Sequence, residues 1–208
     1  MHLLVTMVLL LAAPPEDYKD APFQGWAMSE ERGSTRLIYF SKTSDKPWNY
    51  SPGQVAIEYG QPPWKQEYAQ QFDRLTRGKR WRMGQNYWSN LDTRFPLRMG
   101  QTTVQPGIYY AVLERSAEDD WALILLDPDS TYEMKIDAWH VNRKESPEGL
   151  RVPLQWSKEE RVADKLQIDF TLDEADHRKA VLNIRFGPHR LWVPVQALFQ
   201  GTQVSPEE

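Results

Sequence analysis

The stretch QVAIEYGQPP, residues 54–63, begins the region of the chain that decides the fold. Within it Val55, Ile57 and Tyr59 alternate with small or polar residues, and a glycine- and proline-rich turn follows at once. Side chains of a β-strand point alternately to opposite faces, so this spacing predicts a strand with one buried face. Such a strand needs others to cover it, and the sequence downstream supplies them.

Two more segments belong to this central region. RGKRWRMGQN, residues 77–86, is basic and aromatic. IYYAVL, residues 108–113, is rich in β-branched and aromatic residues and follows a Pro-Gly turn. Because such residues favour strands and such turns connect them, the region is expected to consist of strands joined by turns.

The rest of the chain repeats the two-residue strand period. The alternating segments are residues 95–99, 150–156, 166–172, 182–186 and 191–195, and residues 121–126 are apolar throughout. Many short alternating strands separated by turns are typical of antiparallel sheets with one solvated face. We therefore predict an all-β fold, an antiparallel two-sheet β-sandwich with a jelly-roll-like layout, with a closed barrel as the alternative.

Helical spacing is confined to short segments. Tyr68, Phe72 and Leu75 recur at helical intervals within residues 62–77, and residues 132–141 are long enough for two or three turns. One or two short helices are therefore expected between the strands.

The length of 208 residues suits one good-sized domain. We divide the chain into a signal-like segment and linker (1–20), an N-terminal extension (21–50), the β-sandwich domain (51–200) and a polar tail (201–208). The extension carries a short strand pattern at Thr35–Ser41.

The N-terminus has the pattern of an export signal. A leucine-rich apolar run over residues 3–11 is followed by two alanines and then by a polar stretch. This order is typical of a secretory signal, and the run is too short for a membrane span of roughly 20 residues. The alternative is a buried first strand. We expect a secreted or periplasmic (cell-envelope) protein whose mature chain begins within residues 14–21 and has no transmembrane span.

Composition excludes several classes of function. The formal net charge of −4 gives no general attraction to nucleic acid or to an anionic membrane. The chain has no cysteine, which excludes disulfides, thiol catalysis, thiolate metal sites and a lipidated cysteine anchor. We expect no nucleic-acid partner and no cofactor, and the sequence does not indicate an oligomeric state.

No catalytic or metal-binding motif is found in the sequence. The histidines form no metal-binding pair, and His177 and His189 are expected at the surface. There is no nucleophile elbow, phosphate-binding glycine loop or dinucleotide fingerprint. Asp127–Glu133 carries carboxylates but lacks the glycine of a calcium loop, and we interpret it as a turn. We assign no catalytic residue and no metal ligand.

Charged residues of the central region allow two interpretations. Carboxylates that meet only in space can form a glycosidase-type pair, and the candidates are Glu58, Glu67, Asp73 and Asp92. The structural alternative for each is a solvated surface charge. For Arg74, Arg77, Lys79 and Arg80 a solvated loop is the preferred interpretation.

Aromatic residues crowd the central region and suggest a binding surface. Aromatic rings offer apolar faces with polar edges, which suits sugars and other flat ligands, although core filling accounts for more than half of these rings. An arginine fork matches planar anions and stacks on tryptophan. The candidate ligand-binding residues are Tyr59, Trp64, Arg82, Asn86 and Trp88. The expected ligand is a glycan or a small polar molecule.

Several short motifs resemble a bacterial family known as domain of unknown function 2911. The resemblance covers roughly residues 51–198 and lies in V-x-I-x-Y-G-x-P (Val55, Ile57, Tyr59, Gly60, Pro62), W-R-x-G-x-N (Trp81, Arg82, Gly84, Asn86), a turn and strand (Pro106, Gly107, Tyr109), Trp121, and V-P-V (Val193, Pro194, Val195). The resemblance implies an exported all-β domain and implies no activity. Where the family usually carries small residues after its glycine, this chain has Gln85, Tyr87 and Trp88.

Three functions are consistent with the sequence. The first is a non-enzymatic binding module with exposed aromatic residues at its site. The second is a carboxylate-based hydrolase, which would need two facing carboxylates with raised pKa values. The third is a structural or accessory protein of the cell envelope with all its aromatic residues buried.

Overall fold

The computed structural model describes residues 28–41, 50–142 and 146–198, and the compact folded unit begins at Glu31. Its strands are β1 Gly33–Ser41, β2 Tyr50–Tyr59, β3 Lys79–Trp81, β4 Ser89–Thr93, β5 Leu97–Met99, β6 Thr102–Val104, β7 Gly107–Arg115, β8 Trp121–Leu126, β9 Leu150–Leu172 and β10 Lys179–Ala197. The helices are α1 Gln66–Thr76 and α2 Pro128–Glu133, with a 3-10 turn, η2, at Ala138–His140. The predicted export signal lies outside the described residues.

The described strands form one hydrogen-bonded sheet. Their order is β1-β2-β4-β7-β8-β9-β10-β5-β6, with β3 paired to β7, and every pairing between named strands is antiparallel. The prediction of a mostly antiparallel β fold is confirmed. Hydrogen bonds do not separate the strands into two sheets, because β9 pairs with β8 through its first residues and with β10 along most of its length.

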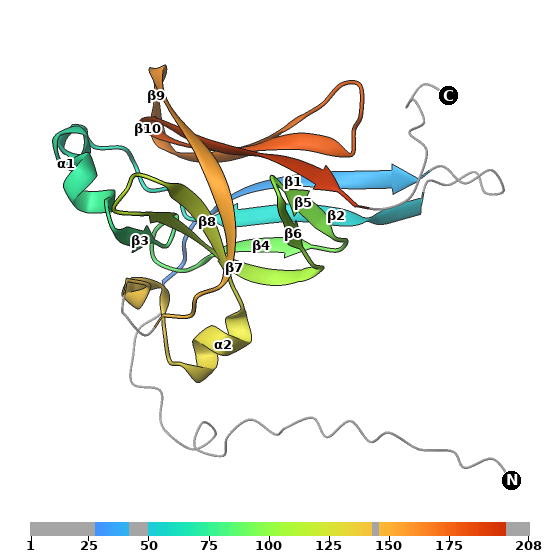
Figure 1. Ribbon diagram of the computed structural model, residues 1–208, viewed down its shortest axis with the longest axis horizontal. Coiled ribbons are helices and arrows are strands. Elements are labelled where there is room, and N and C mark those ends of the chain that lie inside the picture. The colour runs from blue at the N-terminus through green and yellow to red at the C-terminus, as the bar shows by residue number, and fades with distance from the viewer. Residues whose placement is uncertain (1–27, 42–49, 143–145, 199–208) are drawn as a thin grey trace, which may run out of the picture. The chain divides into compact units, whose positions relative to one another are not determined.

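The long strands β9 and β10 rise together to a common apex and then turn back (Figure 1). At the apex Gly187 pairs with Ala163 and His189 pairs with Lys158, so β9 contributes extra residues against a single residue of β10. A bulge of this kind bends a strand without ending it. The bend brings the two ends of β10 together, and the Ala197 N–H donates to the Arg178 carbonyl at 2.8 Å. The sequence predicted separate strands here, whereas the bulge keeps each strand continuous.

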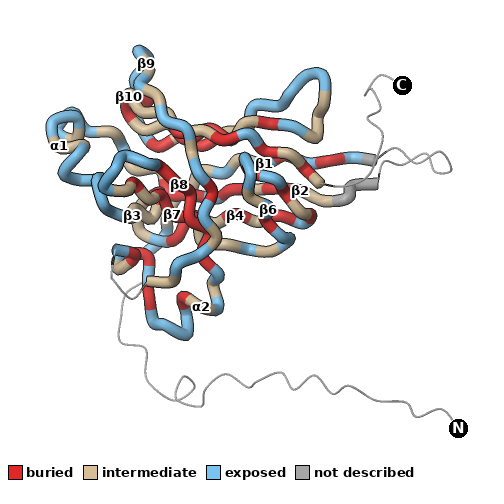
Figure 2. The backbone as a smooth tube through the Cα atoms, viewed as in Figure 1, coloured by how far each residue is buried: buried red, intermediate tan, exposed pale blue. Residues whose placement is uncertain are grey.

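Most buried side chains belong to one core. Strands along the whole strand order, from β1 to β6, contribute residues to it (Figure 2). The residues of β8 are all buried, as expected for an apolar run, because their two faces contribute to different clusters. Leu123 and Leu125 face the main core, whereas Ile124 and Leu126 face a smaller cluster under the segment that follows α2. This second cluster attaches η2 to the outer face of the sheet.

The two helices occupy segments with helical spacing or capping residues. Helix α1 forms within the predicted residues 62–77, and its Phe72 packs against the main core. Helix α2 begins at Pro128, where the sequence predicted a plain turn. The Asp127 side chain accepts a hydrogen bond from the Asp129 N–H, and a proline in the first turn has no N–H to leave unpaired, so both residues favour a helix start.

Candidate functional site

The loop of residues 82–88 has an unusual backbone. Met83, Gly84 and Asn86 have positive φ angles of 52°, 153° and 62°. The Tyr87 N–H donates to the Gln85 carbonyl at 2.8 Å, which closes a γ-turn centred on Asn86. A γ-turn with positive φ is rare and strained, and strained turns occur preferentially at binding sites.

Close packing holds this loop in place. A Cβ atom at Gly60 would lie only 2.7 Å from the Gln85 carbonyl oxygen, so the backbone of the loop rests directly on the end of β2. The buried Ser89 hydroxyl donates to the Met83 carbonyl. The Y-G-x-P and W-R-x-G-x-N motifs, separated in the sequence, therefore meet in the structure.

Stacked aromatic rings support the end of the loop. The Trp88 ring is only 3% exposed and lies parallel to the Tyr110 ring at 4.6 Å between centroids. Tyr87 is 58% exposed, and its hydroxyl lies 3.5 Å from that of Tyr110. Burial, followed by the hydrogen bond with Tyr87, raises the pKa of Tyr110 to about 12, so the Tyr110 hydroxyl remains neutral at physiological pH.

Arg82 covers one side of an exposed tryptophan. Its guanidinium carbon lies 3.9 Å from the centroid of the Trp139 ring, and Trp139 is nevertheless 65% exposed. The Asp137 side chain accepts hydrogen bonds from the Trp139 and His140 N–H groups, which fixes the turn that presents this ring. A guanidinium over a tryptophan face is a favourable cation–π arrangement that orients both groups.

These residues form one surface, which we call the loop face. Its members are Arg82, Tyr87, Tyr110 and Trp139. Tyr87 contacts Tyr110, which stacks on Trp88, and Trp88 packs in the same cluster as Ala138, the residue before Trp139. Arg82 then joins the loop to Trp139.

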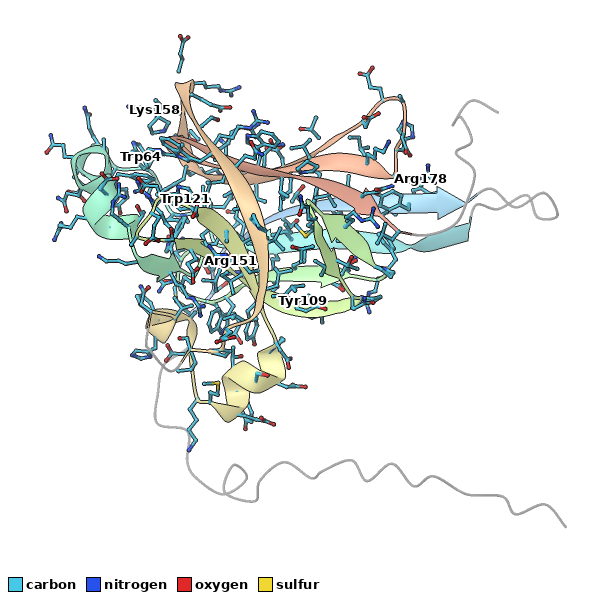
Figure 3. All side chains as sticks on the ribbon, viewed as in Figure 1. Trp64, Tyr109, Trp121, Arg151, Lys158 and Arg178 are labelled. Carbon is cyan, nitrogen blue, oxygen red and sulfur yellow. The ribbon has the colours of Figure 1, made fainter. Side chains whose placement is uncertain are left out.

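The structure separates the five candidates that the sequence predicted. Arg82, Asn86 and Trp88 share the loop, where Asn86 occupies the γ-turn and Trp88 is buried behind the exposed surface. Tyr59 is 4% exposed, inside the main core, and its hydroxyl bonds to the Ile168 backbone. Trp64 lies beside α1, half-buried (Figure 3).

Sequence reasoning did not select Trp139, Tyr87 or Tyr110 as site residues. Trp139 lies far from the loop in sequence, and only the small cluster behind η2 brings it there. One local signal is present in the sequence: Asp137 stands directly before the turn. Aspartate is a favoured capping residue, and its side chain accepts hydrogen bonds from the Trp139 and His140 N–H groups.

Trp64 belongs to an aromatic cluster between α1 and the apex of β10. Its ring lies 5.7 Å from Tyr68, 5.0 Å from Phe186 and 5.8 Å from His189. His189 stacks on Phe72 at 3.6 Å, and its Nδ1 accepts a hydrogen bond from Trp156 Nε1. His189, expected at the surface, is only half-buried, because the bend at Gly187 turns the ring toward α1.

Burial among these rings lowers the pKa of His189 to about 4, and the positive charges of Lys158 and Arg115 act in the same direction. The imidazole is therefore neutral at physiological pH. A neutral ring accepts the indole hydrogen bond that the geometry shows.

Two of the candidate carboxylates of a hydrolase are held in ion pairs with arginines. Glu58 pairs with Arg32 at 2.7 Å, and Asp73 pairs with Arg115 at 2.7 Å. A hydrogen bond from Arg115 is the main cause that lowers the pKa of Asp73, which keeps this carboxyl ionised. A general acid needs the opposite shift. Among the described residues, no three carboxylate or imidazole groups gather as potential metal ligands.

The fold and the loop face together define a mostly antiparallel β protein with a candidate ligand surface of exposed aromatic residues. The chain belongs to the family described as "Protein of unknown function (DUF2911)", which matches residues 42–195. Neither the curated proteins nor the solved structures include a match to this chain. No helix in the described part of the chain has both the length and the apolar character to span a membrane.

Proposed function

We propose that this protein is a non-enzymatic binding module for a glycan or a similar small polar ligand, and that the loop face is its binding site. The observation that carries the proposal is the exposed Trp139 ring, fixed beneath the Arg82 guanidinium. Leaving a large aromatic ring in water has no benefit for the stability of the fold. A ligand that covers the ring would gain that burial energy.

The loop face suits a neutral polar ligand better than a strongly charged one. The Arg82 guanidinium already interacts with the Trp139 ring, and the Tyr87 and Tyr110 hydroxyls are groups that both donate and accept hydrogen bonds. Sugars combine apolar C–H faces with hydroxyl groups and therefore complement aromatic rings edged by hydroxyls. The strained γ-turn holds Tyr87 in place before a ligand arrives, which reduces the entropy lost on binding.

Isothermal titration calorimetry with three neutral oligosaccharides tests the proposal. The titrants are the hexamers of cellulose, of amylose and of chitin, added to the full chain. We expect at least one of them to bind, and we expect Trp139→Ala to weaken that binding by about tenfold or more, since ring burial contributes roughly 1.5–3 kcal/mol. Trp156→Ala is the matched control, because Trp156 is also exposed but lies on β9.

Two results would contradict the proposal. One is the absence of measurable heat with all three hexamers. The other is equal affinity for the wild-type protein and the Trp139→Ala variant, which would move the ligand away from the loop face. A flat result that extends to small anions would favour the structural or accessory role.

We also propose that the protein is exported, as its leucine-rich N-terminal run and the resemblance to an exported family indicate. The full chain, expressed in a Gram-negative host, is expected in the periplasmic fraction with a new N-terminus within residues 14–21. N-terminal sequencing of the purified protein identifies that residue. Recovery of only the uncleaved chain from the cytoplasm would contradict export.

A further inference from the structure

A pocket of about 490 Å³ opens where the two ends of β10 come together, away from the loop face. Its lining includes Arg98 of β5, Thr171 and Leu172 of β9, and Val181, Pro194 and Gln196 of β10. The volume lies within the range of roughly 300–1,000 Å³ that is typical of small-molecule sites. The bend of the long strands creates the pocket, because it places the first and last residues of β10 on opposite walls.

Hydrogen bonds fix both walls of this pocket. On one wall Asp173 Oδ1 accepts from the Ala175 and Asp176 N–H groups and locks the turn between β9 and β10. On the other wall the Gly100 N–H donates to the Pro194 carbonyl at 2.8 Å. The pocket is therefore formed before any ligand binds.

The charges at the pocket favour an anion. Within the described part of the chain, the Arg98 side chain makes no hydrogen bond and no ion pair, while cross-strand pairing with Gln196 holds its backbone in place. The other cation of the lining, Lys179, is paired with Asp176 at 3.3 Å, so Arg98 is the group available to an anionic ligand. The one carboxylate of the lining, Asp173, accepts hydrogen bonds through Oδ1 from two N–H groups of its own turn.

The remaining lining is largely apolar. Leu172 is an exposed side chain, and Val181 and Pro194 face the same space. The Thr171 hydroxyl accepts a hydrogen bond from Asn183 at 3.1 Å and marks the polar inner end of the wall. The lining thus combines an arginine fork with a short apolar surface.

We propose that this pocket binds a small organic carboxylate, with its carboxylate on the Arg98 guanidinium and its apolar body against Val181 and Pro194. An arginine fork matches a carboxylate in a two-point hydrogen-bonded arrangement. The apolar wall favours an acid with a short hydrocarbon body over a bare inorganic anion. This pocket is separate from the loop face. The proposal therefore does not depend on whether the loop face binds a glycan.

Titration of the ¹⁵N-labelled full chain, followed by NMR, tests this site with three probes. Hexanoate carries both the charge and the apolar body, 1-hexanol has the body without the charge, and inorganic phosphate has the charge without the body. We expect hexanoate to shift the amide signals of Thr171, Val181 and Gln196 and to bind at least about tenfold more tightly than either of the other probes.

The decisive variant is Arg98→Gln, which should weaken hexanoate binding roughly tenfold while the remaining amide spectrum stays that of a folded protein. Arg161→Gln is the matched control, because Arg161 is an exposed arginine of β9 outside the pocket. The proposal is overturned if hexanoate does not shift the amide signals of Thr171, Val181 and Gln196. It is also overturned if hexanoate binds the Arg98→Gln and Arg161→Gln variants with equal affinity. Equal binding of hexanoate and 1-hexanol would overturn the role of Arg98.

Discussion

At the scale of single residues, Tyr59 joins parts of the sheet that are distant in sequence. Its hydroxyl accepts a hydrogen bond from the Ile168 N–H at 3.0 Å and donates to the Ile168 carbonyl at 3.3 Å. Among the described residues, no second strand is hydrogen-bonded to β9 at Ile168, because β10 pairs with its opposite edge. The hydroxyl therefore satisfies backbone groups that would otherwise be buried without partners.

Tyr59→Phe removes only this hydroxyl. We expect the free energy of unfolding to fall by about 1–3 kcal/mol, because the buried Ile168 groups lose their partner. Urea unfolding followed by tryptophan fluorescence measures the change. Tyr109→Phe is the control, since the Tyr109 hydroxyl donates to Gln105 in an exposed hydrogen bond, and its loss should matter little. Equal effects of the two substitutions would contradict this role of Tyr59.

His189 makes stability depend on pH. The pKa of the folded protein's imidazole, about 4, lies below the usual 6.5, so the unfolded chain binds the proton more tightly between these values. Its contribution is therefore complete above pH 6.5 and is lost as the pH falls toward 4. Because the ring is partly exposed, we expect a loss of roughly 1–2 kcal/mol.

Comparison with His189→Phe isolates this contribution from that of other groups. Phenylalanine keeps the stack on Phe72 but does not titrate. Urea unfolding at pH 7.0 and pH 4.5 should show that the wild-type protein loses more stability than the variant. The same loss in both proteins would contradict the environment described for His189.

At the scale of the elements, the bend of β10 depends on Gly187. It has a φ of 61°, and a Cβ atom there would lie 2.4 Å from the Trp64 ring. Gly187→Ala should destabilise the protein by about 2–5 kcal/mol, the sum of roughly 1–2 for the left-handed backbone and roughly 1–3 for the forced contact. Thermal and urea unfolding measure this loss.

Gly78 provides a matched control for this substitution. Its φ is 66°, and a Cβ atom there would meet nothing within 4 Å. Gly78→Ala should cost only the backbone part, roughly 1–2 kcal/mol. If both substitutions destabilise equally, the Trp64 contact does not determine the bend.

The sequence predicts the elements of this protein better than their connections. Alternation reveals β2 and most of β9 and β10, because burial on one face imposes a period of two, whereas β8 is revealed by its continuous apolar run and β7 by its β-branched and aromatic residues. It misses β4, whose short SNLDT sequence has one large apolar residue. Gly187-Pro188 predicts the end of a strand. In the structure β10 continues through this position, because the extra residues of β9 opposite it form a bulge.

At the scale of the whole molecule, the site is harder to predict than the fold. The sequence identifies the W-R-x-G-x-N loop, and Arg82 reaches the loop face from it. Tyr59 and Trp64 are of residue types that commonly bind ligands. In the structure, however, Tyr59 bonds to β9 and Trp64 packs against α1, so both have structural partners. Trp139 enters the site only through tertiary packing of η2, which no local pattern encodes.

The indole N–H signals of the protein in a ¹H-¹⁵N spectrum test the central claim most directly. The chain has nine tryptophans, and the indoles of those that the structure describes report on different places in the fold. During titration with the cellulose, amylose and chitin hexamers, we predict that the Trp139 signal shifts most and that the signal of the core residue Trp121 shifts least. An unchanged Trp139 signal at saturating oligosaccharide, or a larger shift at Trp64 or Trp156, would contradict the assignment of the loop face as the binding site.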